Sequence, residues 1–441
     1  MKKLVFIIAC LLITVPCAAD TFTNRKTSEV FQGYATQEKR GSKTLVRIGD
    51  KQAPEYLDLV DYDIEWNPSG RRNQIVILPI KNEIELECET KAFEKAIKSA
   101  SNQGPLLILI EIDTPGGRGD LMKRICDAII KADNCRIVAF VSGGKYGGAY
   151  SAGAIIALAC DYIYMADGTA IGAATPTLVS SSEIKDLKSA YGETVGEKFL
   201  SAERAYIATL AEQSGRSALL AKAMVDRDIE VLEVVEDGNT IFIAPEDKKE
   251  SQLVQHILNK KGSLLTLTAT EAVKCGIANK LLKSEEEIIS EFGFEKPRLV
   301  RNQDVIEARD EFENTKVKLK KIYNDIDYLH KDIDSIHSQF KPVADSYNRA
   351  AKTLIGIEED RRHWNNRRHW NDAVKRQGEV VKELSSQREA LKSALLSALQ
   401  KLGSKYTEAI SLGKAYPDLH VDIESLNKEI NSVDVLSKSI K

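Results

Sequence analysis

Residues 106–117, LLILIEIDTPGG, decide the fold of the middle of this chain. The first seven residues form a near-continuous apolar run, which is typical of a parallel strand covered on both faces. A proline and two glycines follow directly, so the chain turns sharply after the strand. On either side, IVIL at 75–78 and RIVAFV at 136–141 predict two further buried strands. Amphipathic stretches at 89–101 and 121–131 separate the three strands, and this β-α-β-α order predicts a layered α/β domain.

The first 70 residues predict an exported chain with a small β-rich beginning. Residues 1–19 combine two lysines, an apolar run too short to span a bilayer comfortably and small residues before a cleavage point, as signal peptides do. We expect a periplasmic or other extracytoplasmic location, or membrane association if the segment is retained as an anchor. No later apolar run is long enough for a membrane helix, so none is expected in the mature chain. Residues 20–70 alternate in short polar stretches and predict a β-rich lead-in, and residues 71–295 hold the α/β domain.

Residues 300–441 predict a helical coiled-coil arm. Apolar residues at steps of three and four from Phe312 to Phe340 form four heptads of a seam that needs another helix to cover it. We expect breaks at Pro342 and Gly403, where the arm folds back on itself, although a second copy or a partner protein would cover the same seam. Inside the arm, RRHWN occurs twice within residues 361–371. We favour a solvated helix face with both tryptophans packed on a neighbouring helix over a contact surface for an anionic partner.

Composition excludes several classes of protein. Among 441 residues, 62 Lys and Arg stand against 65 Asp and Glu, and the net charge of −3 argues against a general nucleic-acid binder. The 43% of apolar residues argue against a disordered chain. Two of the seven cysteines lie in residues 1–19, which leaves five, an odd number without the spacing of a metal site. We therefore expect buried free thiols, no metal and no cofactor.

Two glycine-rich turns of the α/β domain carry the candidate chemistry. The DTPGG turn at 113–117 exposes backbone N–H groups of the kind that a developing oxyanion needs. The second turn, GGKYGGAYSAG at 143–153, lies between the strand at 136–141 and a helix of small residues. A serine in such a turn presents its hydroxyl beside the N–H of the next residue. Ser151 is therefore the candidate nucleophile.

A serine nucleophile needs a general base, and the histidines are badly placed to supply one. None occurs between residues 21 and 255, so a Ser-His-Asp triad would require His256 to fold back. A buried lysine is the other common base for a serine. The spacing of the residues alone does not show which of Lys185, Lys188 and Lys198 would be this base.

Several motifs, in this order along the chain, resemble the Clp/crotonase fold and, more closely, the protease domain of NfeD-like membrane-associated serine proteases. They are DTPGG at 113–117, SAG at 151–153 with IGAA at 171–174, the stretch from Lys198 to Arg216, and residues 264–278. Signal peptide peptidase A is a more distant relative. The resemblance covers residues 74–290, about half of the chain.

The resemblance implies roles for individual residues. Ser151 would be the nucleophile and Lys198 the general base. The N–H groups of Gly117 and Ala152 would form the oxyanion hole. Tyr150 stands where the family usually has a small residue, which would reshape the pocket. Three residues would lie in the substrate-binding loop: Gly116, Arg118 and Tyr150.

Taken with the resemblance, the sequence predicts an α/β protein with a Clp/crotonase-like β-α-β superhelical core and a long helical C-terminal region. The expected function is that of an exported serine endopeptidase with a Ser-Lys dyad, which cleaves peptides or membrane-associated proteins. We expect a homo-oligomer through the core and an arm that binds itself or a partner protein. One alternative is a Clp-fold scaffold or assembly protein with weak or no catalysis. Another is an acyl-CoA enzyme of the crotonase type, which export argues against because coenzyme A chemistry is intracellular.

Overall fold

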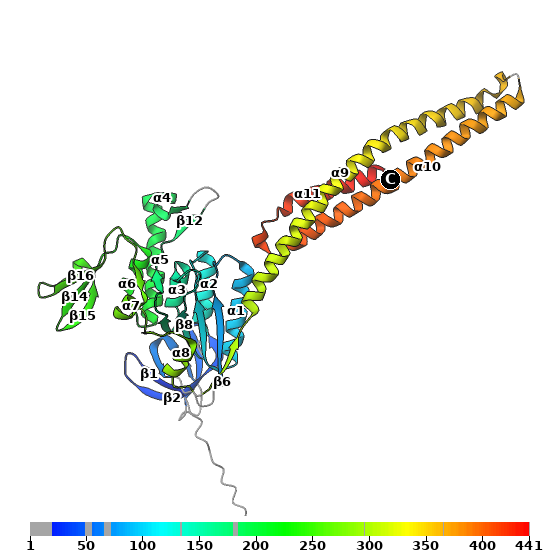
Figure 1. Cartoon of the computed structure of the whole chain (residues 1–441). Coiled ribbons are helices and arrows are strands. Elements are labelled where there is room, and N and C mark those ends of the chain that lie inside the picture. Colours follow the sequence, from blue (N-terminus) through cyan, green and yellow to red (C-terminus); the bar gives the residue numbers. More distant parts are fainter. Residues whose placement is uncertain are drawn as a thin grey trace, which may run out of the picture. The chain divides into compact units, whose positions relative to one another are not determined.

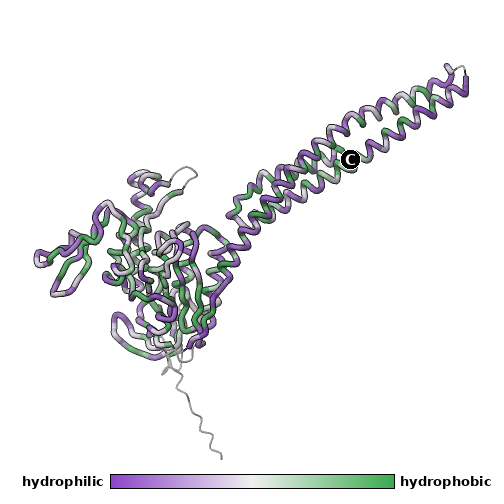
Figure 2. The backbone as a smooth tube through the Cα atoms, in the orientation of Figure 1, coloured by the Kyte–Doolittle hydropathy of each residue, from purple (hydrophilic) through white to green (hydrophobic). Residues whose placement is uncertain are grey.

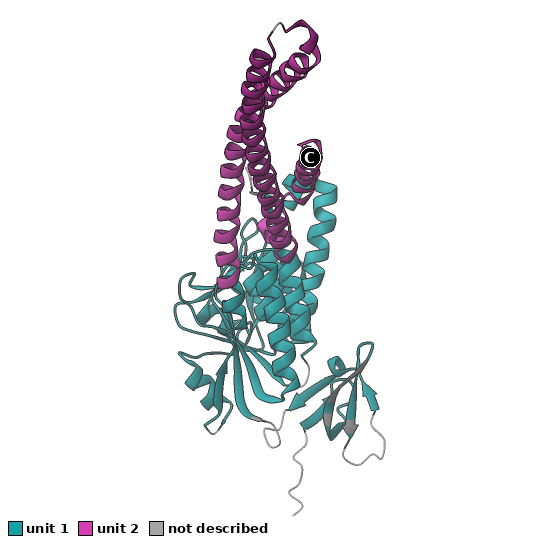
Figure 3. Cartoon of the chain, turned by 90° about the vertical axis from the view of Figure 1, so that its right-hand side faces the viewer, with its two compact units in different colours: residues 1–309 teal, residues 310–441 magenta. Residues whose placement is uncertain are grey.

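The computed structural model describes residues 20–48, 55–65, 72–132, 135–179, 184–294, 296–364 and 366–440 (Figure 1). The predicted signal peptide, residues 1–19, lies outside the described residues. The chain divides into two compact units, residues 1–309 and 310–441 (Figure 3). The division falls inside helix α9 (Asp304–Glu359), so residues 304–309 of this helix belong to the first unit.

The first unit begins with a five-stranded antiparallel sheet in the order β4-β3-β2-β1-β5. Its small core includes Phe22, which is fully buried and stacks on Phe31 with ring centroids 5.0 Å apart. The alternating polar pattern of the sequence therefore corresponds to strands with one face buried. The strands are β1 (Asp20–Asn24), β2 (Val30–Arg40), β3 (Lys43–Ile48), β4 (Glu55–Leu57) and β5 (Tyr62–Glu65).

The centre of the first unit is a six-stranded parallel sheet in the order β18-β10-β8-β7-β6-β19. The predicted α/β class, with long helices after it, is confirmed. The edge strand β19 pairs with β6 beyond residue 295, where we expected the α/β domain to end. The strands are β6 (Arg72–Ile80), β7 (Pro105–Ile112), β8 (Arg136–Val141), β10 (Tyr162–Met165), β18 (Lys280–Leu281) and β19 (Arg298–Arg301).

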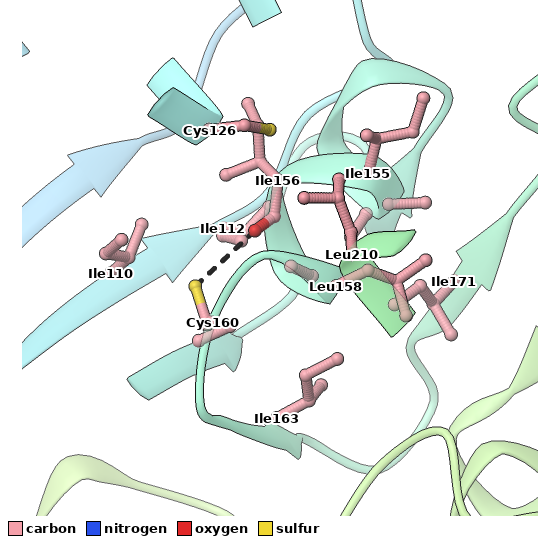
Figure 4. Packing of buried hydrophobic residues seen from close by; sticks show 14 of the residues in the cluster. Ile110, Ile112, Cys126, Ile155, Ile156, Leu158, Cys160, Ile163, Ile171 and Leu210 are labelled. Atoms are coloured by element: carbon pink, nitrogen blue, oxygen red, sulfur yellow. Dashed lines mark hydrogen bonds between the residues drawn. The ribbon is translucent and has the colours of Figure 1, made fainter. Parts of the chain in front are cut away.

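Both faces of this sheet are covered, which is why β7 is buried along its whole length. Ile108 and Ile110 join the larger hydrophobic cluster, whereas Leu107 and Leu109 join a second cluster that includes Ile288 of α8 (Glu285–Glu291). Figure 4 shows part of the larger cluster at close range. The other main helices of the unit are α1 (Glu87–Asn102), α2 (Gly119–Ile130), α3 (Ala152–Leu158), α5 (Glu193–Gln213) and α6 (Ala218–Val225).

The five cysteines of the described residues are free thiols, as predicted. Four of them are buried, and Cys88 is half-buried. The Cys160 thiol donates to the Ile156 carbonyl at 3.4 Å within the larger cluster (Figure 4). Burial raises the pKa of the Cys126 thiol to about 12. These cysteines therefore act as small apolar core residues.

Smaller elements surround the core sheet. A three-stranded sheet in the order β17-β11-β9 is formed by β9 (Gly148–Tyr150), β11 (Ala170–Gly172) and β17 (Thr266–Thr268). A hairpin of β12 (Thr177–Val179) and β13 (Ile184–Asp186) leads into α4 (Leu187–Tyr191). A separate antiparallel sheet, with β14 in the middle, contains β14 (Val231–Glu236), β15 (Asn239–Ile243) and β16 (Leu253–Asn259), and α7 (Ala269–Lys274) follows β17.

The second unit is an antiparallel helical hairpin with a third helix. It contains the rest of α9, α10 (Arg367–Ala415) and α11 (Ile423–Ile440). The predicted seam is buried within the chain itself, since Leu319, Ile322 and Ile326 of α9 share a cluster with Leu399 and Leu402 of α10. Hydropathy alternates along both long helices (Figure 2), as expected when one stripe is covered and the rest is exposed.

The expected break points at Pro342 and Gly403 are wrong. Pro342 lies inside α9 and Gly403 lies inside α10. Both helices are packed on either side of these residues, and this packing outweighs one lost hydrogen bond at proline and the weak helix propensity of glycine. A Cβ at Gly403 would lie 3.8 Å from the Val433 side chain of α11, an ordinary van der Waals contact, so the packing there does not require glycine.

The chain reverses its direction instead at the repeated RRHWN motif. The first copy therefore does not lie on the helix face that we expected. That copy lies in the 3₁₀ helix η3 (Asp360–His363) and the turn after it, and the second copy begins α10. Trp370 packs as expected, because its indole N–H donates to the Ile357 carbonyl at 2.9 Å and the Arg361 guanidinium lies 5.1 Å from its ring centroid. Trp364 is 38% exposed.

Candidate active site

Ser151 occupies a strained turn between β9 and α3. Its backbone angles are φ 53° and ψ −121°, a conformation that costs energy for any residue with a Cβ. The Ser151 N–H donates to the Gly172 carbonyl of β11 at 2.9 Å. On its other side, β9 is bridged to Thr114, whose carbonyl accepts the Tyr150 N–H at 3.0 Å. The serine is thus held from two directions in a strand-to-helix turn, which is the arrangement the sequence predicted.

The glycine turn after β7 packs directly on Ser151. A Cβ at Gly116 would lie 2.5 Å from Ser151 Cβ and 2.9 Å from its Oγ, so only bare backbone fits there. Gly117 has φ 152° and faces Ile84, whose carbonyl oxygen would be 2.3 Å from a Cβ at residue 117. In the part of the chain that the structure describes, the N–H groups of Gly117 and Ala152 donate no hydrogen bond. The two predicted oxyanion donors therefore lie in the two turns that meet at Ser151.

Asp113 organises the second turn, a role the sequence analysis missed. Its side chain is buried, and its carboxylate accepts the N–H groups of Tyr146 and Gly148, both at 3.2 Å. A Cβ at Gly144 would lie 2.6 Å from its Oδ2. The acidic residue directly after a buried strand was the available signal, because a carboxylate there can bind the N–H groups of a neighbouring glycine-rich loop.

The three candidate lysines are in different environments. Lys188 binds three carboxylates, those of Glu193, Glu197 and Asp228, at 3.1, 3.2 and 3.4 Å. Hydrogen bonds to Glu193 and Glu197 raise the pKa of Lys188, so this lysine stays cationic and is a poor base. Lys198 is exposed on α5, and Lys185 is exposed on β13. Among the described residues, no hydrogen bond joins Ser151 to Lys198.

Helix α5, which carries Lys198, is anchored at its middle and just after its end. At its middle, Arg204 pairs with Glu197 and with the buried Asp226. At its end, the buried Arg216 donates to the carbonyls of Cys160 at 2.8 Å and Ile277 at 2.9 Å. Burial lowers the pKa of Arg216 to about 10. These contacts fix the position of α5 and therefore of Lys198. The sequence analysis did not predict the contacts of Arg216, because a buried arginine after a glycine is not a recognisable pattern.

Exposed apolar side chains lie close to Lys198 in the sequence of α5. Val195 and Phe199, on either side of Lys198 in the sequence, are 43% and 48% exposed. The Phe199 ring lies 5.2 Å from the ring of Tyr191. Exposed apolar groups next to a candidate catalytic residue are typical of a surface that binds a partner or a substrate.

The remaining candidate residues differ in their partners. Tyr150 is half-buried on β9. Arg118 binds Asp120 of its own helix, with Nη2 and Oδ2 2.7 Å apart, and the Glu85 carbonyl at 3.3 Å. His256 lies on β16, opposite Glu233 of β14. The described residues contain no group of three metal-ligating side chains, and none of their helices is both long and apolar enough to cross a membrane.

Comparisons with known proteins find relatives of a part of the first unit. Residues 74–252 match the model of the NfeD1b N-terminal domain. The chain is 32% identical over 163 residues to the membrane-bound protease PH1510 of Pyrococcus horikoshii, which covers 37% of this chain and 35% of that protein. It is 26% identical over 238 residues to membrane protein NfeD1b of Bacillus subtilis, which covers 54% of this chain and 45% of that protein. The chain thus spans less than half the length of either relative.

Two solved structures of the 1510-N membrane-bound stomatin-specific protease are also similar. One is a serine-to-alanine mutant, with 24% identity and a TM-score of 0.38, which covers 52% of this chain and 98% of that chain. The other is a lysine-to-alanine mutant in complex with a substrate peptide, with 27% identity and a TM-score of 0.36, which covers 50% of this chain and 80% of that chain. The predicted resemblance is confirmed: residues 74–252 match the NfeD1b N-terminal domain, and part of the chain shows homology to the membrane-bound protease PH1510.

Proposed function

We propose that this chain is a serine endopeptidase in which Ser151 is the nucleophile and Lys198 the general base. The observation that carries the proposal is the strained turn at Ser151, which packs against bare glycine backbone; the Gly117 and Ala152 amides in the two turns that meet there donate no hydrogen bond among the described residues. Strain of this kind persists only where the surrounding structure enforces it, and it occurs often at catalytic residues.

In the proposed reaction, Ser151 Oγ attacks the carbonyl carbon of a peptide bond. Negative charge then develops on the carbonyl oxygen, and the N–H groups of Gly117 and Ala152 donate to it. Each such donor is worth about 10²–10³ in rate. Both amides already lack a partner in the described chain, so no hydrogen bond has to break before they act.

In its neutral form, Lys198 would take the proton from the Ser151 hydroxyl and then donate it to the leaving amine. It is the better candidate of the two lysines on α4 and α5, because Lys188 is held by three carboxylates. Catalytic hydrogen bonds are often long in a free enzyme and shorten when substrate binds. We infer that a substrate covering Val195 and Phe199 removes water from Lys198 and completes the dyad.

The proposed substrate is an extended peptide or a membrane-associated protein with apolar side chains. The exposed apolar groups around Lys198 support this class, as does the relative whose structure holds a substrate peptide. The membrane-bound description of the relatives supports a location at or outside the cytoplasmic membrane, with export by residues 1–19. We also propose that the core forms a homo-oligomer.

Labelling with a serine-reactive fluorophosphonate tests the proposal. The wild-type chain should be labelled at Ser151, and Ser151→Ala should not be labelled. Ser142→Ala is a matched control, since Ser142 lies between β8 and the glycine-rich turn and its hydroxyl donates to the Gly143 carbonyl at 3.4 Å. Labelling of Ser151→Ala at the wild-type rate would contradict the assignment of the nucleophile.

A non-catalytic assembly protein is the second candidate. It is favoured by the exposed position of Lys198 and by the long helical hairpin of the second unit. In that case neither the wild type nor any variant would be labelled, so the same experiment separates the two functions.

A further inference from the structure

The segment from Asn82 to Glu85 is hydrogen-bonded to the loop that carries the Gly117 amide. It follows β6 and precedes α1. The Ile84 N–H donates to the Gly116 carbonyl at 2.8 Å, and the Ile84 carbonyl accepts the Arg118 N–H at 2.8 Å. These two bonds fix the chain on both sides of Gly117. The direction of the Gly117 N–H therefore depends on where Ile84 lies.

Arg309 of α9 binds both this segment and α1. Its Nε and Nη2 bind the two carboxylate oxygens of Glu89 at 2.6 and 2.7 Å, and Nη2 also donates to the Glu83 carbonyl at 3.0 Å. Two-point binding of a carboxylate by a guanidinium is both strong and directional. Burial raises the pKa of Glu89, and the hydrogen bond from Arg309 opposes that rise. A single side chain thus joins α9, α1 and the segment before α1.

The apolar packing beside this segment is incomplete. Ile84 and the buried Val305 of α9 both line a cavity of about 220 Å³ that also touches Phe93 of α1. The cavity is partly open to solvent, so one side of Ile84 is not packed against protein. The hydrogen bonds of Ile84, and that of Arg309 to the Glu83 carbonyl, help to hold the segment in place.

We propose that Arg309 is a positioning residue for the oxyanion loop, acting through Glu83 and Ile84 on Gly117. It touches neither the nucleophile nor Gly117 itself. The proposal rests on the proposed function, because it assigns Arg309 to the support of the oxyanion donor. Arg309 is the last residue of the first unit, so the proposed support lies within that unit.

The test uses the full chain with Arg309→Ala, Arg309→Lys and the matched control Arg301→Ala. Arg301, on β19, makes a comparable pair with Glu285, with Nη2 and Oε2 2.7 Å apart. Among the described residues it makes no contact with Asn82–Glu85. Peptide hydrolysis gives kcat and KM separately, and hydrogen exchange with mass spectrometry follows the amides of residues 112–121.

We expect Arg309→Ala to lower kcat by about 10- to 100-fold, less than the about 10²–10³ of a fully lost donor, with KM changed by less than about threefold. Arg309→Lys should recover part of kcat, and Arg301→Ala should stay within about threefold of wild type. Exchange at residues 116–118 should be faster in Arg309→Ala and unchanged in Arg301→Ala.

Equal loss of kcat in Arg309→Ala and Arg301→Ala, or unchanged exchange at residues 116–118 in Arg309→Ala, would overturn the proposal. If the wild type neither hydrolyses peptides nor is labelled, the proposed function fails, and the exchange measurement still decides whether Arg309 holds the loop. If Arg309→Ala does not fold, peptide hydrolysis and hydrogen exchange are measured for Arg309→Lys and Glu89→Gln instead. Faster exchange in these milder variants would then support the proposal, and unchanged exchange would overturn it.

Discussion

Replacing Gly116 with alanine tests the packing of the glycine turn on Ser151. A Cβ at this position would lie 2.5 Å from Ser151 Cβ and 2.9 Å from its Oγ. The backbone there has φ 113°, which side chains with L configuration rarely adopt. Backbone strain of this kind costs about 1–3 kcal/mol, and overpacking costs about 1–3 kcal/mol more. We therefore expect Gly116→Ala to lower the free energy of unfolding by about 2–6 kcal/mol.

Gly119→Ala is the matched control, because no atom lies within 4 Å of a Cβ built at Gly119, the first residue of α2. Urea unfolding should place this control within about 1 kcal/mol of wild type. Fluorophosphonate labelling should be slower by about 100-fold or more in Gly116→Ala, because a shift of about 1 Å in a reacting group costs that much. Equal unfolding free energies for the two alanine variants would refute the packing that we describe.

Four further predictions concern the base, the core, the domain boundary and the turn of the arm. Lys198→Arg should abolish hydrolysis of a fluorogenic peptide because a guanidinium cannot lose its proton, whereas Lys188→Arg should keep the ion pairs and most of the activity. Loss of activity in Lys188→Arg but not in Lys198→Arg would make Lys188 the base. Stability in urea should fall as pH rises above about 9, because burial raises the pKa of Cys126 to about 12 and the unfolded thiol ionises first; Cys126→Ala should weaken that dependence. A chain ending at Arg309 should melt at a higher temperature than one ending at Pro297, which lacks β19 and the buried Val305. Trp370→Ala should cost about 1–3 kcal/mol in unfolding free energy and the exposed Trp364→Ala about 0.5 kcal/mol or less, so equal effects would contradict the contacts of Trp370.

The parts of the fold that the sequence predicted are those whose signal is local. The strand before DTPGG is apolar at nearly every position because both of its faces are buried, and that run is visible without any knowledge of its neighbours. The turn at Ser151 was visible for a similar reason, because glycines are required where the backbone packs against itself. Strand β19 was missed, since RLVR is short, lies at the sheet edge and contains two arginines.

The arm shows how packing overrides local signals. Pro342 and Gly403 are residues that commonly end helices, yet both lie inside long helices that bury a continuous seam against each other. The reversal lies between the end of α9 at Glu359 and the start of α10 at Arg367, where the sequence shows no glycine or proline. The heptads predicted that a hairpin or a second chain must cover the seam, but the position of the turn depends on which pairs of apolar residues come into register. That register is a property of the paired helices, and neither helix specifies it alone.

The general base is the hardest residue to assign from sequence, and the structure explains why. Three lysines lie within fourteen residues of one another, between Lys185 and Lys198, and each has the same chemistry when free. What distinguishes them is the set of acids around each one, and one of the acids around Lys188 comes from a distant position: Asp228 is forty residues away. A lysine that is surrounded by carboxylates holds its proton, so the ion pairs that anchor α4 to α5 also remove Lys188 from consideration as a base. The same network leaves Lys198 without a carboxylate partner among the described residues and beside apolar side chains. In the proposed mechanism a substrate must cover Lys198 to complete the dyad, so the activity should depend on substrate binding as well as on Ser151 and Lys198 themselves.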